Sequence, residues 1–102
     1  MAETTALAFE VNFTRLGDLL IEEIGEVGLK IILMLGRQEK MVMLELKRSG
    51  LSYSSIYRML PILEKYGLIK EEREGIKRFF SLTEKGQLFY KKLLELEDLL
   101  AK

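Results

Sequence analysis

Apolar residues recur at helical spacing through the first third of the chain. Thr14 is placed to cap a first helix, whose apolar positions are Leu16, Leu19, Leu20 and Ile24. Gly25 and Gly28 then either break this helix in two or allow it to bend. A second helix is expected to end at Gly36, a residue that suits the position after a helix. It is apolar almost all round, which predicts a place at the centre of the core; its apolar positions are Val27, Ile31, Ile32, Leu33 and Leu35.

Two further amphipathic segments are separated by a glycine. Residues 41–49 predict a short helix that ends at Gly50. Ser52 can cap the next helix, which stops at Gly67 and carries apolar residues at i, i+4 and i+7. These inward positions are Ile56, Leu60 and Leu63. Two helices joined by a tight, glycine-containing turn predict a helix-turn-helix.

The last third predicts a hairpin and a long helix. Residues 68–73 and 76–82 predict two strands, joined by a turn at Glu74–Gly75. Thr83 can cap a final helix, with Glu84 favourable in its first turn. The apolar seam of that helix is Phe89, Leu93, Leu96 and Leu100, widened by Leu88, Leu94 and Leu99. This helix either packs on its own domain or forms a dimer interface, and the stripe favours the dimer because it is broader than one flank of a monomer needs.

The pattern therefore predicts a mainly α fold with a small antiparallel β-hairpin. The expected architecture is a winged helix-turn-helix with an N-terminal helix and a long C-terminal dimerisation helix. Residues 1–25 form the predicted N-terminal helical extension, and residues 26–82 the DNA-binding domain. Residues 83–102 form the dimerisation helix.

The composition argues against catalysis and against a metal or other cofactor. Among its 102 residues the chain has no cysteine and no histidine, which removes disulfides, thiolate ligands, and the commonest general base and metal ligand. Carboxylate pairs such as Glu22–Glu23 and Glu71–Glu72 have no convergent polar partner, so they are interpreted as solvated surface. We predict that the protein is not an enzyme.

The chain is expected to be cytoplasmic and associated with the nucleoid. No secretory signal opens it, and the longest apolar run, Ile31–Leu35, is far too short to cross a bilayer. Scarce Asn and Gln beside abundant Lys and Glu are typical of a thermophile.

The net charge of zero conceals an uneven distribution. Residues 1–36 carry two basic and six acidic residues, whereas residues 37–82 carry ten basic and six acidic residues. Fields at a protein surface act within a Debye length of about 8 Å, so a neutral chain can still present a basic side to DNA.

Two stretches carry a resemblance to known regulators. Ser55–Ile69 (SIYRMLPILEKYGLI) resembles the recognition helix and following turn of the PadR and MarR families, and Lys77–Gly86 (KRFFSLTEKG) resembles their second wing strand. The resemblance covers about residues 29–90, and Tyr57 and the leucine-rich last helix lean towards PadR. It implies a homodimeric repressor or activator with its wing beside DNA.

Pro61 departs from the pattern of both families. It removes one backbone N–H from the predicted recognition helix and should lose the bond to the Tyr57 carbonyl. The helix is expected to bend, or to end early and resume. A bend either re-aims the recognition helix or is merely tolerated.

The outward positions of the predicted recognition helix are candidate DNA contacts. Arg58 suits the O6 and N7 acceptors of guanine, and Tyr57 suits a phosphate or a thymine methyl group. The alternative for Arg58 is a solvated surface arginine, and for Tyr57 a partly buried core aromatic. The remaining candidates on this helix, which include phosphate-binding hydroxyls, are Ser52, Tyr53, Ser54 and Ser55.

The predicted wing adds further basic candidates. Arg73 and Lys77 flank the turn and Arg78 follows, so this hairpin can enter a minor groove or lie along phosphates. The hypothesis favours Lys77 and Arg78 over Arg73, while three glutamates of the same hairpin oppose phosphate binding. Lys47 and Arg48 either complement their helix dipole or reach the DNA backbone.

These features together predict a sequence-specific, double-stranded DNA-binding transcriptional regulator. A homodimer would place two recognition helices about one turn of DNA, roughly 34 Å, apart on a pseudo-palindromic site. The alternative is a winged-helix protein-interaction module in a larger assembly, because fold alone does not decide function.

Overall fold

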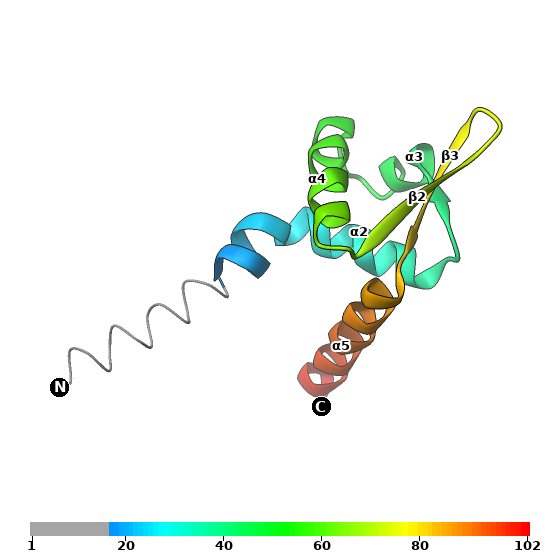
Figure 1. The fold of residues 1–102 in the computed structure, drawn as a ribbon. Helices are drawn as coiled ribbons and strands as arrows, with labels where there is room; N and C mark the ends of the chain where they lie inside the picture. The colour runs from blue at the N-terminus through cyan, green and yellow to red at the C-terminus, as the bar shows by residue number, and fades with distance from the viewer. Residues whose placement is uncertain (1–16) are drawn as a thin grey trace.

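The computed structural model describes residues 17–102, so the predicted cap at Thr14 and the apolar position Leu16 lie outside the described residues. Helical and extended elements alternate along the rest of the chain (Figure 1). They are η1 (Gly17–Ile24), α2 (Gly25–Arg37), β1 (Met41–Val42), α3 (Met43–Lys47), α4 (Tyr53–Lys65), β2 (Ile69–Glu74), β3 (Lys77–Leu82) and α5 (Glu84–Ala101).

The first two helical segments meet at a glycine with a left-handed backbone. Gly25 has a φ of +58°, so the predicted break between two helices is confirmed there. The prediction that the second helix ends at Gly36 is wrong, because α2 continues to Arg37. Gly36 instead allows α2 to approach α5 closely, because a Cβ at this position would lie 2.4 Å from the ring of Tyr90 in α5.

The helix-turn-helix consists of α3 and α4. The turn between them contains Gly50 with a φ of +100°, and Ser52 caps α4 by accepting the Ser55 N–H at 3.2 Å. The helix α4 runs through Pro61 without interruption, so the expectation of an early end is wrong. It ends before Gly67, as predicted.

The sheet has three antiparallel strands in the order β1-β3-β2, not the two strands of the predicted hairpin. Met41 and Val42 were assigned to a helix by their apolar pattern, and this assignment is wrong. Met41 is buried opposite Phe80 of β3, and the carboxylate of Glu45 accepts the Val42 N–H at 3.0 Å. This bond caps α3, so the helix begins only after the short strand.

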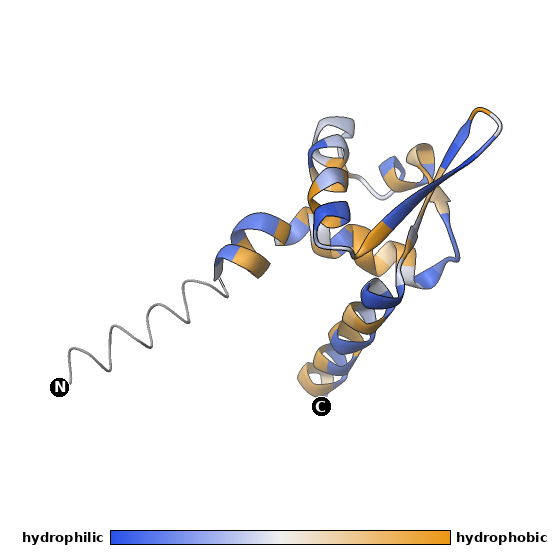
Figure 2. Cartoon of the chain, viewed as in Figure 1, coloured by the Kyte–Doolittle hydropathy of each residue, from blue (hydrophilic) through white to orange (hydrophobic). Residues whose placement is uncertain are grey.

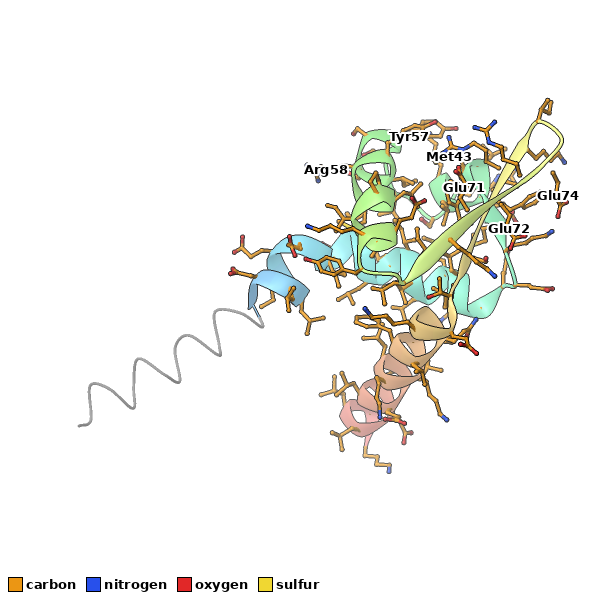
Figure 3. The ribbon with its side chains drawn as sticks, viewed as in Figure 1. Met43, Tyr57, Arg58, Glu71, Glu72 and Glu74 are labelled. Carbon is orange, nitrogen blue, oxygen red and sulfur yellow. The ribbon has the colours of Figure 1, made fainter. Side chains whose placement is uncertain are left out.

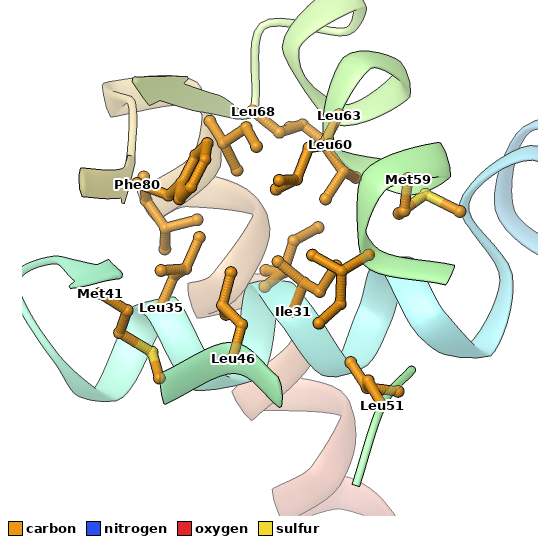
Figure 4. Close-up of a cluster of buried hydrophobic side chains, with 14 of the residues drawn as sticks. Ile31, Leu35, Met41, Leu46, Leu51, Met59, Leu60, Leu63, Leu68 and Phe80 are labelled. Atoms are coloured by element: carbon orange, nitrogen blue, oxygen red, sulfur yellow. The ribbon is translucent and has the colours of Figure 1, made fainter. Parts of the chain in front are cut away.

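The core lies between α2, α4 and the inner face of the sheet (Figure 4). Ile31, Ile32 and Leu35 place α2 at its centre, as its apolar sequence predicted. Phe80 closes the core from the sheet side and is almost fully buried. The predicted inward residues of α4 are all buried: Ile56, Leu60 and Leu63.

The start of α5 is tied to the turn that follows α4. Thr83 caps α5 by accepting the Gly86 N–H at 3.0 Å, and its own hydroxyl donates to the Gly67 carbonyl. From this anchor α5 extends away from the wing, and its C-terminal end lies on the opposite side of the molecule from the hairpin tip (Figure 1). Among residues 17–102 no helix has the length and apolar content needed to cross a bilayer.

Candidate nucleic-acid interface

The outer face of α4 is open to solvent. Ile56, Met59 and Leu60 point into the core, which leaves Ser54 and Arg58 exposed on the outside and Tyr57 54% exposed. The predicted orientation of this helix is therefore confirmed. The outer side of the N-terminal half of α4, the part that enters the major groove in helix-turn-helix proteins, is thus exposed in the described part of the chain.

Three serine hydroxyls meet at the N-terminal end of α4. The Ser52 Oγ lies 3.2 Å from the Ser54 Oγ and 2.9 Å from the Ser55 Oγ. The cap itself uses only the acceptor side of Ser52, since its oxygen accepts the Ser55 N–H. Hydroxyls at the positive end of a helix dipole suit a phosphate oxygen.

The tyrosines of α4 form a surface pair that reaches α3. The rings of Tyr53 and Tyr57 lie 6.3 Å apart between centroids, and the Lys47 Nζ lies 4.9 Å from the Tyr53 ring centre. This cation–π contact holds Lys47 beside α4. Arg48 follows at the end of α3, exposed next to the same turn.

Tyr57 and Arg58 point to different sides of α4. Figure 3 shows Tyr57 on the side of Met43 and the wing, and Arg58 on the opposite side of the helix. Tyr57 borders a groove of about 420 Å³ between α3, α4 and the wing. The other residues of this groove are Val42, Met43, Leu44, Ile76, Lys77, Arg78 and Phe80.

Each glutamate of the wing has a cation beside it within the protein. Glu71 pairs with Arg78, Glu74 pairs with Lys40, and the Glu72 carboxylate lies 3.5 Å from the Lys70 Nζ. Such exposed pairs add little stability, yet they compensate the negative charge that would otherwise repel phosphates. The objection that these glutamates raise against DNA binding is therefore weakened.

Lys40 also braces the wing from the chain before β1. Its Nζ lies 4.4 Å from the ring centre of Phe79, on the same face of the hairpin as Glu74. The hydrogen bond to Glu74 raises the pKa of Lys40 above its usual value.

The cations of the wing divide into held and free groups. Arg78 is held by Glu71 and lies 5.6 Å from the ring centre of Phe80. Within residues 17–102, Arg73 and Lys77 at the tip take part in no ion pair. The ion pair of Arg78 was not inferred from sequence, and which of these cations contact DNA stays a prediction. The missing signal was the register, which sets Glu71 diagonal to Arg78 on one face.

The predicted dimerisation residues separate into two pairs. Phe89 and Leu93 are partly buried against the core of their own chain. Leu96 and Leu100 are exposed, Leu100 at 84%, and they line a groove of about 510 Å³ between α2 and α5. Sequence reasoning missed the α2 side of this groove, Leu29 and Leu33, although the apolar circumference of α2 was a signal for it.

The charged groups of the described chain do not converge on a metal. Within residues 17–102 no cluster of three or more His, Cys, Asp and Glu side chains is close enough to bind one ion.

Comparison with known families gives one match over most of the chain. A family model described as "Winged helix-turn-helix" matches residues 29–101, from within α2 to the end of α5. No curated protein sequence matches the chain.

Solved structures of transcriptional regulators have the same fold. The transcriptional repressor BigR of Xylella fastidiosa superposes with a TM-score of 0.67 at 19% identity, covering 95% of this chain and 97% of that one. An apo-form mutant of ZitR from Lactococcus lactis gives 0.68 at 19% identity, over 99% of this chain and 76% of that one. The transcriptional regulator HlyU of Vibrio vulnificus gives 0.62 at 24% identity, over 90% and 97%.

These neighbours narrow the resemblance inferred from sequence. The fold that this chain shares with BigR, ZitR and HlyU supports the likeness to PadR and MarR regulators at the level of the winged helix-turn-helix and not for those two families specifically. At such identities the likeness concerns the fold alone.

Proposed function

The chain belongs to the winged helix-turn-helix family, and from this premise we propose that it is a sequence-specific, double-stranded DNA-binding transcriptional regulator that acts as a homodimer in the cytoplasm, at the nucleoid. The observation that carries this proposal is the open outer face of α4. Arg58, Tyr53 and Tyr57 are exposed there, and Glu64 is the first acidic residue of the helix.

Binding energy and sequence choice come from different residues. Lys47 and Arg48 at the end of α3, and Arg73 and Lys77 at the wing tip, are exposed and suit phosphates, which supply affinity without reading sequence. Arg58 is the residue on α4 with the donor geometry for a guanine edge. The three serine hydroxyls at the start of α4 fix the helix on the DNA backbone.

The dimer follows from the apolar groove between α2 and α5. Leu96 and Leu100 leave apolar surface in water that a second copy of the chain would cover. Two-fold symmetry then presents two α4 helices to successive major grooves and requires a pseudo-palindromic site.

Replacement of Arg58 by alanine is expected to weaken specific binding by about 1–3 kcal/mol and to relax the preference for one base pair. Arg58 makes no ion pair within residues 17–102, so its loss should leave the fold intact. The measurement is a gel-shift titration on duplexes that the wild-type protein selects from a random pool, followed by selection with the variant.

Lys92→Ala is the matched control, because it removes one positive charge from α5, away from α4. We expect the control to select the same sequences as wild type. Unchanged affinity and base preference in Arg58→Ala would remove Arg58 from the reading role.

A second candidate function is supported by the groove between α3 and the wing. Leu44 is 51% exposed on its edge, and Met43 and Val42 add further apolar surface where a DNA backbone would pass. These residues suit a winged-helix module that docks a protein. The two functions differ in salt dependence, since only DNA binding should weaken steeply with salt.

A further inference from the structure

The tip of the wing carries an apolar side chain that lies almost entirely in solvent, at the edge of the groove beside Tyr57. Ile76 is 99% exposed, more than any other large hydrophobic residue between positions 17 and 102. Figure 2 shows the tip as a hydrophobic spot on an otherwise largely hydrophilic part of the hairpin. Since the side chain is so exposed, packing of the core does not explain it.

The geometry of the turn does not require isoleucine either. Glu74 pairs with Lys77, so Gly75 and Ile76 form a two-residue loop, and Gly75 supplies the positive φ of +63°. The second position of such a loop is most often occupied by a polar residue or glycine. A β-branched apolar residue there places hydrophobic surface in water without a benefit to the hairpin.

Cations stand on both sides of this apolar side chain. Arg73 and Lys77 flank the loop, and within the described residues neither is held by a carboxylate. The nearest acid, Glu74, is held by Lys40. The tip therefore combines one apolar point with two available positive charges.

This combination fits the minor groove of duplex DNA. Its two walls are lines of phosphates, which attract flanking cations, and apolar side chains that enter it can wedge between base pairs. A narrow A·T-rich groove strengthens the attraction of the cations. If the wing tip instead bound a purely apolar surface of another protein, Arg73 and Lys77 would have no oppositely charged partners there.

We propose that Ile76 is an apolar wedge that enters the minor groove beside the site read by α4 and partly unstacks one base step, with Arg73 and Lys77 on the phosphates of the two strands. The inference rests on the proposed DNA-binding function. It adds a second contact, whose strength depends on how easily the DNA sequence at that position deforms. It assigns flexible pyrimidine–purine steps, such as TA, to the flanks of each half-site.

The test uses a duplex that the wild-type protein selects from a random pool, with each flanking adenine replaced in turn by the fluorescent base 2-aminopurine. Unstacking brightens this base, so wild type should raise its emission at one flanking position per half-site. Ile76→Ser should abolish the rise and weaken binding about tenfold, by loss of the buried apolar side chain. Its salt dependence should match wild type, because no charge changes.

Ile76→Val is the conservative control and should keep both the brightening and most of the affinity. Both variants should melt at the wild-type temperature because Ile76 is not part of the core. Lys77→Ala should reduce the magnitude of the slope of log K against log salt by about one, and it should keep some of the rise in 2-aminopurine emission.

The inference and the function on which it rests fail in different ways. If wild type binds the duplex but Ile76→Ser has the same affinity and emission, the wedge is wrong and the regulator stands. If wild type binds no duplex even at low salt, both fall. Brightening that persists in Ile76→Ser would assign the unstacking to another residue and would also overturn the wedge.

Discussion

Gly86→Ala is expected to destabilise the protein by about 3 kcal/mol, the upper end of the usual cost of overpacking. A Cβ at position 86 would lie 2.0 Å from the backbone oxygen of Leu68. This oxygen also accepts the Thr83 N–H at 3.1 Å, so it cannot retreat without breaking the junction between β2 and α5. The clash outweighs the gain of up to about 1 kcal/mol that alanine normally brings to a helix.

The measurement for Gly86→Ala is the free energy of unfolding from urea titration. Gln87→Ala is the matched control: the neighbouring residue of α5 is exposed, so its truncation should change the free energy by less than about 0.5 kcal/mol. Equal stability of the two variants would show that the approach of α5 to the Leu68 carbonyl is not as close as described.

Replacement of both Leu96 and Leu100 by glutamate is expected to give a folded monomer that binds a two-half-site duplex about 10²- to 10⁴-fold more weakly. The loss reflects avidity, because the second half-site is otherwise bound at a high effective concentration. Both leucines are exposed in the single chain, at 55% and 84%, so the core should survive. Four carboxylates brought together across a two-fold axis would prevent association.

Sedimentation equilibrium and duplex titration together test this double variant. Leu88→Glu is the control, because Leu88 is 63% exposed on α5 but lines a different groove, with Tyr90 and Leu94. We expect this control to remain dimeric. A dimeric Leu96→Glu/Leu100→Glu variant with wild-type DNA binding would contradict the proposed interface.

Local signals in the sequence predicted most of the fold. The caps at Ser52 and Thr83 depend on residues within three positions, and the sequence predicts both. Gly50 and Gly67 likewise mark ends that need a positive φ. These features are encoded by neighbours in the chain, which is why pattern alone suffices.

The errors arose where distant residues decide the local structure. Gly36 satisfies the requirements of a helix end, but the ring of Tyr90, far along the chain, makes it a packing position within α2. Met41 continues an apolar helical pattern, but its pairing with Phe80 makes it a strand. Tyr90 is too far along the chain from Gly36, and Phe80 from Met41, for a local sequence pattern to reveal either contact.

For the candidate interface too, the sequence predicted what depends on local pattern and not what depends on contacts between strands. The exposure of Tyr57 and Arg58 follows from the helical period of α4 and was predicted correctly. The ion pair that holds Arg78 was not predicted, because it depends on which glutamate lies beside Arg78 across the hairpin. Charge counts along a sequence do not contain this pairing.

The two proposed surfaces occupy opposite sides of the molecule. The wing tip and the N-terminal half of α4 lie on one side, and α5 extends to the other (Figure 1). A dimer formed through the far part of α5 would thus leave both recognition helices free. Within residues 17–102 the wing glutamates are paired with cations, whereas Arg58, Arg73 and Lys77 take part in no ion pair. A chain of zero net charge can therefore still present unpaired cations on this side of the molecule.

The most direct test of this account is the affinity of the wild-type protein for a random-sequence duplex as a function of salt concentration. Four cations near α4 and the wing tip, if all reach phosphates, predict a slope of log K against log salt of about −3.6 per bound protomer. These cations are Lys47, Arg48, Arg73 and Lys77. A slope near zero, or no binding at low salt, would contradict the DNA-binding role and favour the protein-docking alternative.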